Sequence, residues 1–569
     1  SARSGRHGLN RGKIQDVVGS VATERAISTI ALHAHGIPHV FPPAVMDEAA
    51  KADHATMKNR EDWRKIPLVT IDPADAKDHD DAVFAEVDEN PENRGGVVVY
   101  VAIADVAWYV RPDSALDREA FKRGNSVYFP DRVVPMLPER ISNDLCSLKE
   151  GVDRPALAVR MTFSRDGRKI GHTFHRVMMK SAARLAYTQA QQAIDGAPDD
   201  KTETILDGVL KPLWHAYDVL KRGRDRRQPL DLDLPERKVM LSEEGKVTSV
   251  AFTDRLDAHK LIEEMMVLAN VAAAETLNAK DMPLLFRVHE EPSQDKLESL
   301  RDTAESAGLT LAKGQVLKTR HLNQLLHQAA GKDEAELINM ATLRSMTQAY
   351  YSPKNFGHFG LALQNYAHFT SPIRRYADLI VHRRLKRLMR GDRRKPNQKR
   401  LAEVCAHISD CEREAEYAER EMVDFYKALF MKDKIGERYS GHVSGVTSFG
   451  LFVELEETFV EGMVPFQELT DDYYHHLPEE HSVLGERTGR RFRLGDPVTI
   501  RVLSVDLSRR EVAFQMLAGG GHEVPRGGTA ARRSSRTAGR KRPQRTPKGN
   551  SAKKPLRKRP ARKRNTRRK

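Results

Sequence analysis

The alternation of apolar and polar residues predicts β-strands along much of the chain between residues 66 and 170. The clearest period-two runs are "DAVFAEV", "GGVVVYVAIADVAWYV", "NSVYF" and "LAVRMTFS". Side chains that repeat every second residue share one face of a strand, and these runs are rich in β-branched and aromatic residues. The polar segment "DENPENRGG" separates the first two runs, so we expect them to form a hairpin.

Helical periodicity follows this region. Residues 259–278 and 378–391 carry apolar side chains at i, i+3 and i+4, which predicts amphipathic helices. The highly charged stretch 411–432 is expected to form a helix with a mostly solvated face. Residues 1–62 combine a short helical segment with the proline-rich run "IPHVFPPAV", and we interpret them as a connecting segment at the end of a preceding domain.

Short period-two runs separated by glycines return between residues 435 and 517, a pattern typical of a small β-barrel. Together these patterns predict an α+β multidomain protein. A large domain at 63–434 would hold a mixed β-sheet with helices, and a barrel domain would occupy 435–517. Residues 518–569 follow as a glycine-containing linker and a tail rich in Lys and Arg.

The net charge of +15 comes from this tail. Val524–Lys569 holds 20 of the 94 Lys and Arg residues and no Asp or Glu, so that the rest of the chain carries a net charge of −5. A segment of this composition has too few apolar residues for a core, and we expect it to be disordered. Basic tails bind polyanions by releasing condensed counterions. A solubilising tail without a particular partner is the alternative.

Other features exclude whole classes of protein. Cys146, Cys405 and Cys411 are too few and too scattered for a disulfide framework or a cysteine-based zinc site. No apolar run approaches the roughly 20 residues that span a bilayer. The first twenty residues lack the apolar core of a secretory signal. We therefore expect a cytoplasmic protein in a reducing environment, without a membrane partner.

Residues 69–87, "VTIDPADAKDHDDAVFAEV", hold a cluster of aspartates at Asp72, Asp75, Asp78, Asp80 and Asp81. Neighbouring carboxylates repel one another and raise each other's pKa, so the cluster costs free energy unless something compensates for it. An acidic surface turn is one explanation. The apolar runs on both sides favour another, in which the acids lie between buried elements.

Carboxylate oxygens suit hard cations such as Mg²⁺, with Mn²⁺ as the alternative. An EF-hand is excluded, because Lys77 stands where its loop needs Gly and Val83 stands where it needs Glu. His79 is either a further ligand or a structural neighbour, and we favour the neighbour. Clustered carboxylates with Mg²⁺ recur in phosphodiester cleavage, where the ions generate hydroxide and stabilise the leaving oxygen. The cluster therefore favours a Mg²⁺-dependent phosphoryl-transfer enzyme.

Three long motifs add a family resemblance. "TIDPADAKDHDD", "GNSVYFPDRVVPMLPERISNDLCSLKEGVDRPALAVRM" and "FGLALQNYAHFTSPIRRYADLIVHRRL" resemble the catalytic (RNB) domain of the ribonuclease II/ribonuclease R family. The barrel motif "GHVSGVTSFGLFVEL" is similar to an S1-type RNA-binding domain, which has an OB fold. The order of RNB domain, S1-type domain and basic tail is most similar to the ribonuclease R branch, and the resemblance covers residues 60 to 517.

The resemblance implies a processive 3′→5′ exoribonuclease that releases nucleoside 5′-monophosphates by Mg²⁺-dependent hydrolysis. Its partners would be single-stranded RNA 3′ ends and structured RNA with a 3′ overhang, and whether the tail recruits ribosomes or a helicase stays open. The family favours a monomer. Relatives carry cold-shock-type OB domains before the RNB domain, and residues 1–62 match only the end of one, so how RNA is fed in and how duplexes are opened stays open.

The resemblance also implies roles for the acids. Asp72, Asp78, Asp80 and Asp81 match the family's D-x5-D-x-D-D pattern, whereas Asp75 lies outside it. The four matching residues would be metal ligands. Asp80 would also be the catalytic acid on which turnover depends most.

Other motif positions match residues that bind RNA in the family. Tyr128 would stack on the terminal base, a contact that needs no particular sequence; strand packing is the alternative. Arg374 would be catalytic, gripping a phosphate near the scissile bond, and Arg375 is the less favoured bearer of that role. Glu263 would belong to the nucleotide pocket, with helix-surface charge as the alternative.

In the barrel, Phe449 and Phe452 are candidates for RNA binding. Their spacing places them on opposite faces of an ideal strand, unless Gly450 permits a bulge or bend. If the strand is regular, one of the two rings belongs to the barrel core.

Two other functions remain in competition with the nuclease. A non-catalytic RNA-binding protein on the same scaffold would have lost one or more acids, yet all four pattern positions are intact. A Mg²⁺ phosphohydrolase acting on small nucleotides would need neither a base-stacking tyrosine nor two polyanion-binding appendages.

Overall fold

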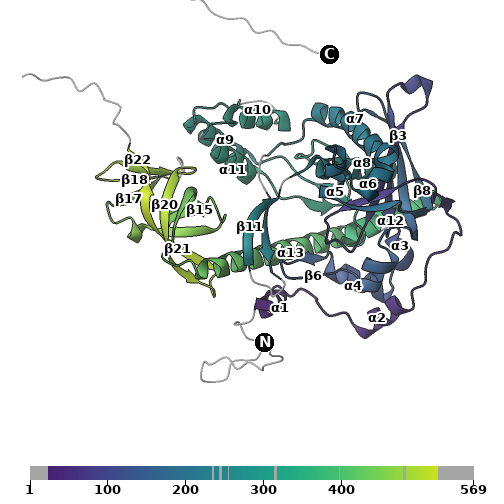
Figure 1. Cartoon of the computed structure of the whole chain (residues 1–569), viewed down its shortest axis with the longest axis horizontal. Coiled ribbons are helices and arrows are strands. Elements are labelled where there is room, and N and C mark those ends of the chain that lie inside the picture. The colour runs from purple at the N-terminus through teal and green to yellow at the C-terminus, as the bar shows by residue number, and fades with distance from the viewer. Residues whose placement is uncertain are drawn as a thin grey trace, which may run out of the picture. The chain divides into compact units, whose positions relative to one another are not determined.

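The computed structural model describes residues 24–522, apart from residues 233–235, 243–246, 254, 313–316, 333, 396 and 478–481 (Figure 1). The basic tail from residue 523 onward lies outside the described residues, so its expected disorder stays a prediction. Within the described ranges, no helix combines the length and the apolar character needed to cross a bilayer.

A seven-stranded sheet forms the centre of the large domain, in the order β1-β8-β7-β4-β3-β2-β9. Its strands are β1 Glu61–Asp62, β2 Val69–Asp72, β3 Asp81–Val87, β4 Val97–Ala104, β7 Asp153–Phe163, β8 Lys169–Lys180 and β9 Ala183–Ala186. The pairs β2–β3, β3–β4, β4–β7 and β7–β8 are antiparallel, whereas β9 joins β2 in parallel and β1 joins β8 in parallel. The predicted hairpin is confirmed, because β3 pairs with β4 from Asp81↔Ile103 to Val87↔Val97.

One predicted strand run was too long. The run that begins with β4 ends as a strand at Ala104, and Val106–Tyr109 forms the short helix α3 instead. The Asp105 N–H donates to the Pro155 carbonyl, and the Trp108 N–H donates back to the Asp105 carbonyl, so the chain turns after β4. A short apolar run does not by itself separate a strand from a buried helix.

Helices pack against this sheet and complete its core. They include α5 Tyr187–Ile194, α7 Lys211–Arg227, α8 Asp257–Ala279 and α12 Tyr376–Met389. The two helices predicted from the 3.6-residue period are confirmed as α8 and α12. Helix α7 packs on β3 and β4, α8 packs on β4, and α12 packs on α8. Their buried side chains join those of β2, β3, β4 and β7 in one large apolar cluster.

Smaller elements surround this core. They are α1 Glu24–Ala34, α2 Pro43–Ala50, α4 Ala115–Arg123, β5 Val127–Tyr128, β6 Val133–Val134, α6 Asp200–Ile205, β10 Glu236–Leu241, β11 Val247–Thr253, β12 Phe286–Val288, α9 Gln294–Ser306, α10 Thr319–Ala329, α11 Ala335–Ser345 and β13 Tyr350–Ser352. Helices α9, α10 and α11 share a leucine-rich cluster of their own.

The predicted barrel is a closed one, in the order β14-β15-β16-β21-β20. Its strands are β14 Arg438–Val446, β15 Gly450–Leu455, β16 Glu461–Pro465, β20 Pro497–Asp506 and β21 Glu511–Gly519. Alternate residues of β15 (Leu451, Val453 and Leu455) are fully buried in the barrel core. A small sheet of β17 Tyr474–Leu477, β18 Ser482–Gly485, β19 Arg490–Arg493 and β22 Gly521–His522 accompanies the barrel.

One long helix, α13 Gln398–Lys432, links these parts (Figure 1). The sequence pattern predicted only its second half, and with a mostly solvated face. Instead, Leu401 and Cys405 belong to the main core, Ala418 and Met422 to a cluster with β5 and β6, and Met431 to the barrel core. Small and apolar residues at helical spacing along α13 supply this packing.

Candidate functional site

The aspartate cluster lies in the loop between β2 and β3. Asp72 is the last residue of β2 and Asp81 the first of β3, and the antiparallel pairing of Val69 with Val83 brings these two strand ends together. Asp80 is only 6% exposed, whereas Asp72, Asp78 and Asp81 are half-buried. Asp75 is exposed, but the other four acids do not form an exposed loop tip, so the surface-turn explanation is wrong for these four.

The rest of the protein holds this loop in place. The Ser147 hydroxyl donates to the Lys77 carbonyl at 3.0 Å and accepts the His79 N–H at 3.1 Å. Arg184 donates to the carbonyls of two loop alanines at 3.0 and 3.2 Å. His79 is buried, and its Nδ1 lies 2.8 Å from Oδ2 of Asp72. His79 thus orients a carboxylate, as expected of a structural neighbour.

Electrostatics in the cluster follow from burial and from repulsion between the acids. Burial raises the pKa of Asp80 well above its ordinary value, and the charges of Asp78 and Asp81 raise it further. Burial and then Asp72 raise the pKa of Asp81 to about 8. Burial is also the main cause that raises the pKa of Asp78. Without a compensating cation, the cluster would take up protons rather than carry its full negative charge.

The spacing of the acids agrees with this repulsion. No three of the cluster's carboxylates and His79 bring ligand atoms within 4.8 Å of one another. Bare carboxylates repel, so their oxygens stand apart until a cation draws them in. The donors are all oxygens, which fits a hard divalent cation by chemistry. The acids therefore do not form a closed single-ion cage in this structure.

Backbone hydrogen bonds join the three sequence motifs at this point. The Ile373 N–H donates to Oδ1 of Asp80 at 3.0 Å, across a sequence separation of 293 residues. The Ser126 N–H donates to the Arg374 carbonyl at 3.0 Å, and the Tyr376 N–H donates to the Gly124 carbonyl at 2.9 Å. The segment that precedes Tyr128 is therefore paired with the segment that carries Arg374, and the latter is pinned to the aspartates.

The two neighbouring arginines of this segment have different partners. Arg375 donates to both carboxylate oxygens of Asp378 at 2.8 Å, and Asp378 is fully buried. Arg374 donates to the Ser371 hydroxyl at 3.2 Å, and among the described residues no carboxylate lies within 4.0 Å of its guanidinium. Its charge nevertheless lowers the pKa values of Asp78, Asp80 and Asp81. Arg374 thus lies beside the acids with its charge available to an anion.

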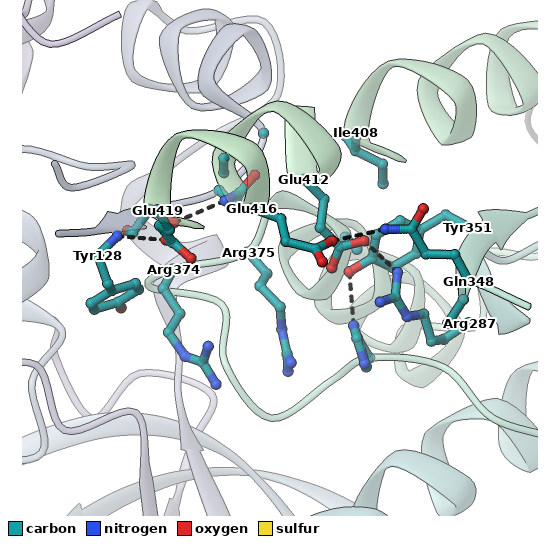
Figure 2. A pocket seen from close by; sticks show the side chains of 17 residues that line it. Tyr128, Arg287, Gln348, Tyr351, Arg374, Arg375, Ile408, Glu412, Glu416 and Glu419 are labelled. Carbon is teal, nitrogen blue, oxygen red and sulfur yellow. Dashed lines mark hydrogen bonds and ion pairs between the residues drawn. The ribbon is translucent and has the colours of Figure 1, made fainter. Parts of the chain in front are cut away.

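A cavity of about 440 Å³ opens beside these residues. Figure 2 shows Tyr128, Arg374 and Arg375 extending to the same side, away from helix α13. Tyr128 is 41% exposed, and burial of its hydroxyl raises its pKa to about 12, with smaller contributions from Asp78 and Asp80. Tyr128 and Arg374 therefore line one cavity, and the aspartates are close enough to interact electrostatically with both, although they are not among the lining residues.

Sequence reasoning missed the opposite wall of this cavity. Glu412, Glu416 and Glu419 of α13 line it. Glu412 pairs with Arg287 at 2.5 Å, Glu416 accepts from the Gln348 amide at 2.8 Å, and Glu419 accepts the backbone N–H of Tyr128 at 2.7 Å (Figure 2). Their i, i+4 and i+7 spacing places them on one helix face. This spacing was the only sequence signal for an acidic cavity wall, but acids on a solvent-facing helix surface show the same spacing.

Glu263 lies elsewhere. It lines a smaller cavity of about 80 Å³ and forms an ion pair with Arg255. The neighbouring Glu264 is buried and accepts two hydrogen bonds from Arg227, each 3.2 Å long. The described interactions do not link Glu263 to the aspartates, so its assignment to the nucleotide pocket stays a prediction.

Phe449 and Phe452 lie together on the barrel. Phe449 stands in the turn just before β15 and is 58% exposed, and Phe452 is half-buried. Their rings meet edge to face, with centroids 6.3 Å apart. The Gly450 N–H donates to the Thr447 hydroxyl at 3.2 Å, and a Cβ on Gly450 would lie 2.6 Å from the Val464 carbonyl. The glycine bend thus brings both rings to one surface, and neither belongs to the barrel core.

Comparisons with known proteins agree with this architecture. The RNB domain family matches residues 60–391, and the S1 RNA binding domain family matches residues 432–517. Ribonuclease R of Escherichia coli is 40% identical over 524 residues, which are 89% of this chain and 64% of that protein. Ribonuclease R of Aquifex aeolicus is 40% identical over 515 residues, which are 89% of this chain and 72% of that protein. The chain thus spans less than two thirds of the Escherichia coli relative.

A solved structure shares the fold. Ribonuclease R of Mycoplasma genitalium, in complex with ribose-methylated single-stranded RNA, superposes with a TM-score of 0.83 at 28% identity. The match covers 88% of this chain and 79% of that one. The same Mycoplasma protein has also been solved in complex with double-stranded RNA.

Proposed function

Because the chain belongs to the ribonuclease R family of RNB-domain proteins, we propose that it is a processive 3′→5′ exoribonuclease that hydrolyses RNA to nucleoside 5′-monophosphates with Mg²⁺. One observation carries the proposal. Tyr128 and Arg374 come from two distant motifs and line one cavity, and hydrogen bonds from Ser126 and Ile373 join their segments to each other and to Asp80 of a third motif. These groups suit an RNA 3′ end, because Tyr128 can stack on a base, Arg374 can bind a phosphate, and the acids can hold the cation for hydrolysis.

The aspartates fit the divalent cation that the reaction needs. Nucleases of the RNB family are generally divalent-metal dependent. We assign Asp72, Asp78, Asp80 and Asp81 as its ligands, because the raised pKa values of Asp78, Asp80 and Asp81 indicate negative charge that the protein alone does not compensate. Bound Mg²⁺, or Mn²⁺ in its place, would supply hydroxide at neutral pH and stabilise charge on the leaving oxygen.

The protein's own residues position the RNA. The Ile373 N–H fixes one oxygen of Asp80 and so orients the carboxylate on which we expect turnover to depend most. Arg374 would neutralise charge that develops on the phosphate oxygens. Tyr128 would stack on the terminal base, and its backbone is held by Glu419. Glu263 is proposed as a more distant contact to the nucleotide.

The barrel is proposed to hold the RNA upstream of the cavity. Phe449 and Phe452 offer neighbouring ring faces and edges on one surface, which suits base stacking without sequence preference. We retain the domain division into 1–62, 63–434, 435–517 and 518–569 as part of this proposal. The substrates would be single-stranded 3′ ends and structured RNA with a 3′ overhang. We expect a cytoplasmic monomer whose basic tail contacts ribosomes or a helicase.

Incubation of 5′-labelled single-stranded RNA with the protein and Mg²⁺ tests the proposal. We expect the RNA to shorten progressively to short end products with release of mononucleotides, and we expect no shortening with Asp80→Asn. Unchanged RNA that is nevertheless bound would identify a non-catalytic RNA-binding protein. Hydrolysis of free nucleotides alone would identify a phosphohydrolase.

A further inference from the structure

A second group of metal-type ligands lies away from the aspartates, where α11 meets the barrel. His442 of β14 and Glu454 of β15 face each other as a cross-strand pair, and Glu336 of α11 approaches them. Nε2 of His442 lies 2.7 Å from Glu336 Oε1 and 3.7 Å from Glu454 Oε1. Among the described residues, this is the only group of three or more His, Cys, Asp or Glu whose ligand atoms all lie within 4.8 Å of one another.

The chemistry of this group differs from that of the aspartates. It combines an imidazole nitrogen with two carboxylates, a donor set that suits Zn²⁺ and similar transition cations better than Mg²⁺. Glu454 is 7% exposed and Glu336 is about half exposed, so the group is closed on the barrel side and open to water on the helix side. Two carboxylates that converge on one imidazole create negative charge that a divalent cation would neutralise.

The distances between the ligand atoms of these three residues also fit a bound cation. Ligand atoms about 2.0–2.2 Å from a tetrahedral ion lie about 3.3 Å from one another. The observed separations of 2.7 and 3.7 Å lie on either side of that value, so small side-chain rotations would complete the shell. The backbones are already fixed: the strand pairing sets His442 against Glu454, and Arg344 of α11 donates to the Ser444 carbonyl of β14 at 3.3 Å.

We propose that Glu336, His442 and Glu454 bind one divalent transition cation of the Zn²⁺ class, with water as the fourth ligand, and that this cation fastens helix α11 to the barrel. The role is structural, because the donors come from two parts of the chain that pack together here. The proposal does not depend on the exoribonuclease activity.

Titration of the chelator-treated protein, residues 1–569, with Co²⁺ in excess Mg²⁺ tests this proposal. The excess Mg²⁺ is added to compete with Co²⁺ for the aspartates, which we assigned above as Mg²⁺ ligands, and the visible absorption of Co²⁺ reports nitrogen-containing, low-coordinate sites. We expect one equivalent of Co²⁺ to bind with intense visible bands that added Zn²⁺ removes. His442→Gln and Glu336→Gln should each weaken that binding at least tenfold. The matched control is His475→Gln, because His475 pairs with the single carboxylate of Glu486 at 3.5 Å on the neighbouring sheet.

Two results would overturn the proposal. One is equal Co²⁺ binding by the wild-type protein and by both variants. The other is the absence of any tight Co²⁺ site in the wild-type protein, which would leave the three residues as a hydrogen-bonded latch only. Glu336 is half exposed on a helix surface, so Glu336→Gln keeps the test decisive even if His442→Gln fails to fold. Failure of RNA hydrolysis would leave this outcome unchanged, because the readout is metal binding.

Discussion

Arg374 and Arg375 are adjacent in sequence, and the structure predicts opposite consequences when each is replaced by Gln. Arg375 holds Asp378, a fully buried carboxylate, with two hydrogen bonds of 2.8 Å. Removal of one partner of a buried ion pair costs about 3–5 kcal/mol, because the other charge stays buried without its partner. The Ser371 N–H still donates to Asp378 at 2.8 Å, so we expect the lower end of that range, about 3 kcal/mol, for Arg375→Gln.

Arg374→Gln should instead act on catalysis. Its guanidinium donates to the neutral Ser371 hydroxyl and pairs with no described carboxylate, so its loss should change the free energy of unfolding by less than about 1 kcal/mol. If Arg374 stabilises charge on the scissile phosphate, its loss should lower kcat by about 10²–10³, as for the loss of one oxyanion donor. Single-turnover hydrolysis of 5′-labelled RNA and urea unfolding of both variants measure the two quantities.

Two observations would refute these opposite expectations for the two arginines. The first is an Arg375→Gln protein as stable as the wild type, because the buried pair would then contribute nothing. The second is an Arg374→Gln protein whose activity per folded molecule equals that of the wild type. Because a loss of stability also lowers activity, the activities must be compared under conditions in which the urea unfolding curves show both variants to be fully folded.

Three further predictions concern stability and RNA affinity. Asp105→Asn should lower the free energy of unfolding by about 3–5 kcal/mol, because buried Asp105 pairs with Arg60 at 2.9 Å and Lys386 at 2.6 Å, and urea unfolding measures this. His382 is fully buried, and burial lowers its pKa to about 4. Between about pH 6.5 and 4, only the unfolded state binds a proton at His382. The free energy of unfolding should therefore decrease by about 1.4 kcal/mol for each unit by which the pH is lowered, and His382→Gln should remove this contribution. Phe449→Ala, in the inactive Asp80→Asn protein, should weaken single-stranded RNA binding about 5- to 150-fold by fluorescence anisotropy.

Each of these has a result that contradicts it. An Asp105→Asn protein of wild-type stability would mean that the two cations find other partners. A slope of stability against pH that His382→Gln leaves unchanged would assign the acid sensitivity to other buried groups, such as His358, whose pKa burial lowers to about 3. RNA affinity that falls equally with Leu503→Ala, an exposed apolar residue of β20, would remove any special role for Phe449.

Local sequence patterns predicted the parts of the fold that local physics decides. Helices α8 and α12 follow from apolar residues at 3.6-residue spacing, and the hairpin of β3 and β4 follows from alternation around a polar turn. The sheet order could not be predicted this way, because β2 pairs with β9 and β1 pairs with β8 across long stretches of chain. The period of a strand says which face is buried and gives no information about its neighbour.

The same limit applies to the site. The acids could be recognised from their density, but the hydrogen bond from Ile373 to Asp80 and the pairing of Ser126 with Arg374 span intervals that no local pattern encodes. The family resemblance indicated indirectly that these distant segments meet, because the family's motifs contribute to one site. The family motif favoured Arg374 over Arg375, but the physical reason could not be predicted from the sequence, because it lies in Asp378, with which only Arg375 pairs.

Helix α13 explains why the cavity and the barrel cannot be considered independent. At 35 residues it is about 50 Å long, and a helix is stiff over that distance. One part of it supplies Glu419, which holds the backbone of Tyr128, and its end places Met431 in the barrel core. Ala418, between them, is fully buried against the cluster that includes β5, the strand of Tyr128. A shift of the barrel along this helix axis would therefore have to move Glu419 or break the packing at Ala418. The position of the tyrosine in the cavity is thus tied, through one rigid element, to the domain that we propose holds the RNA upstream.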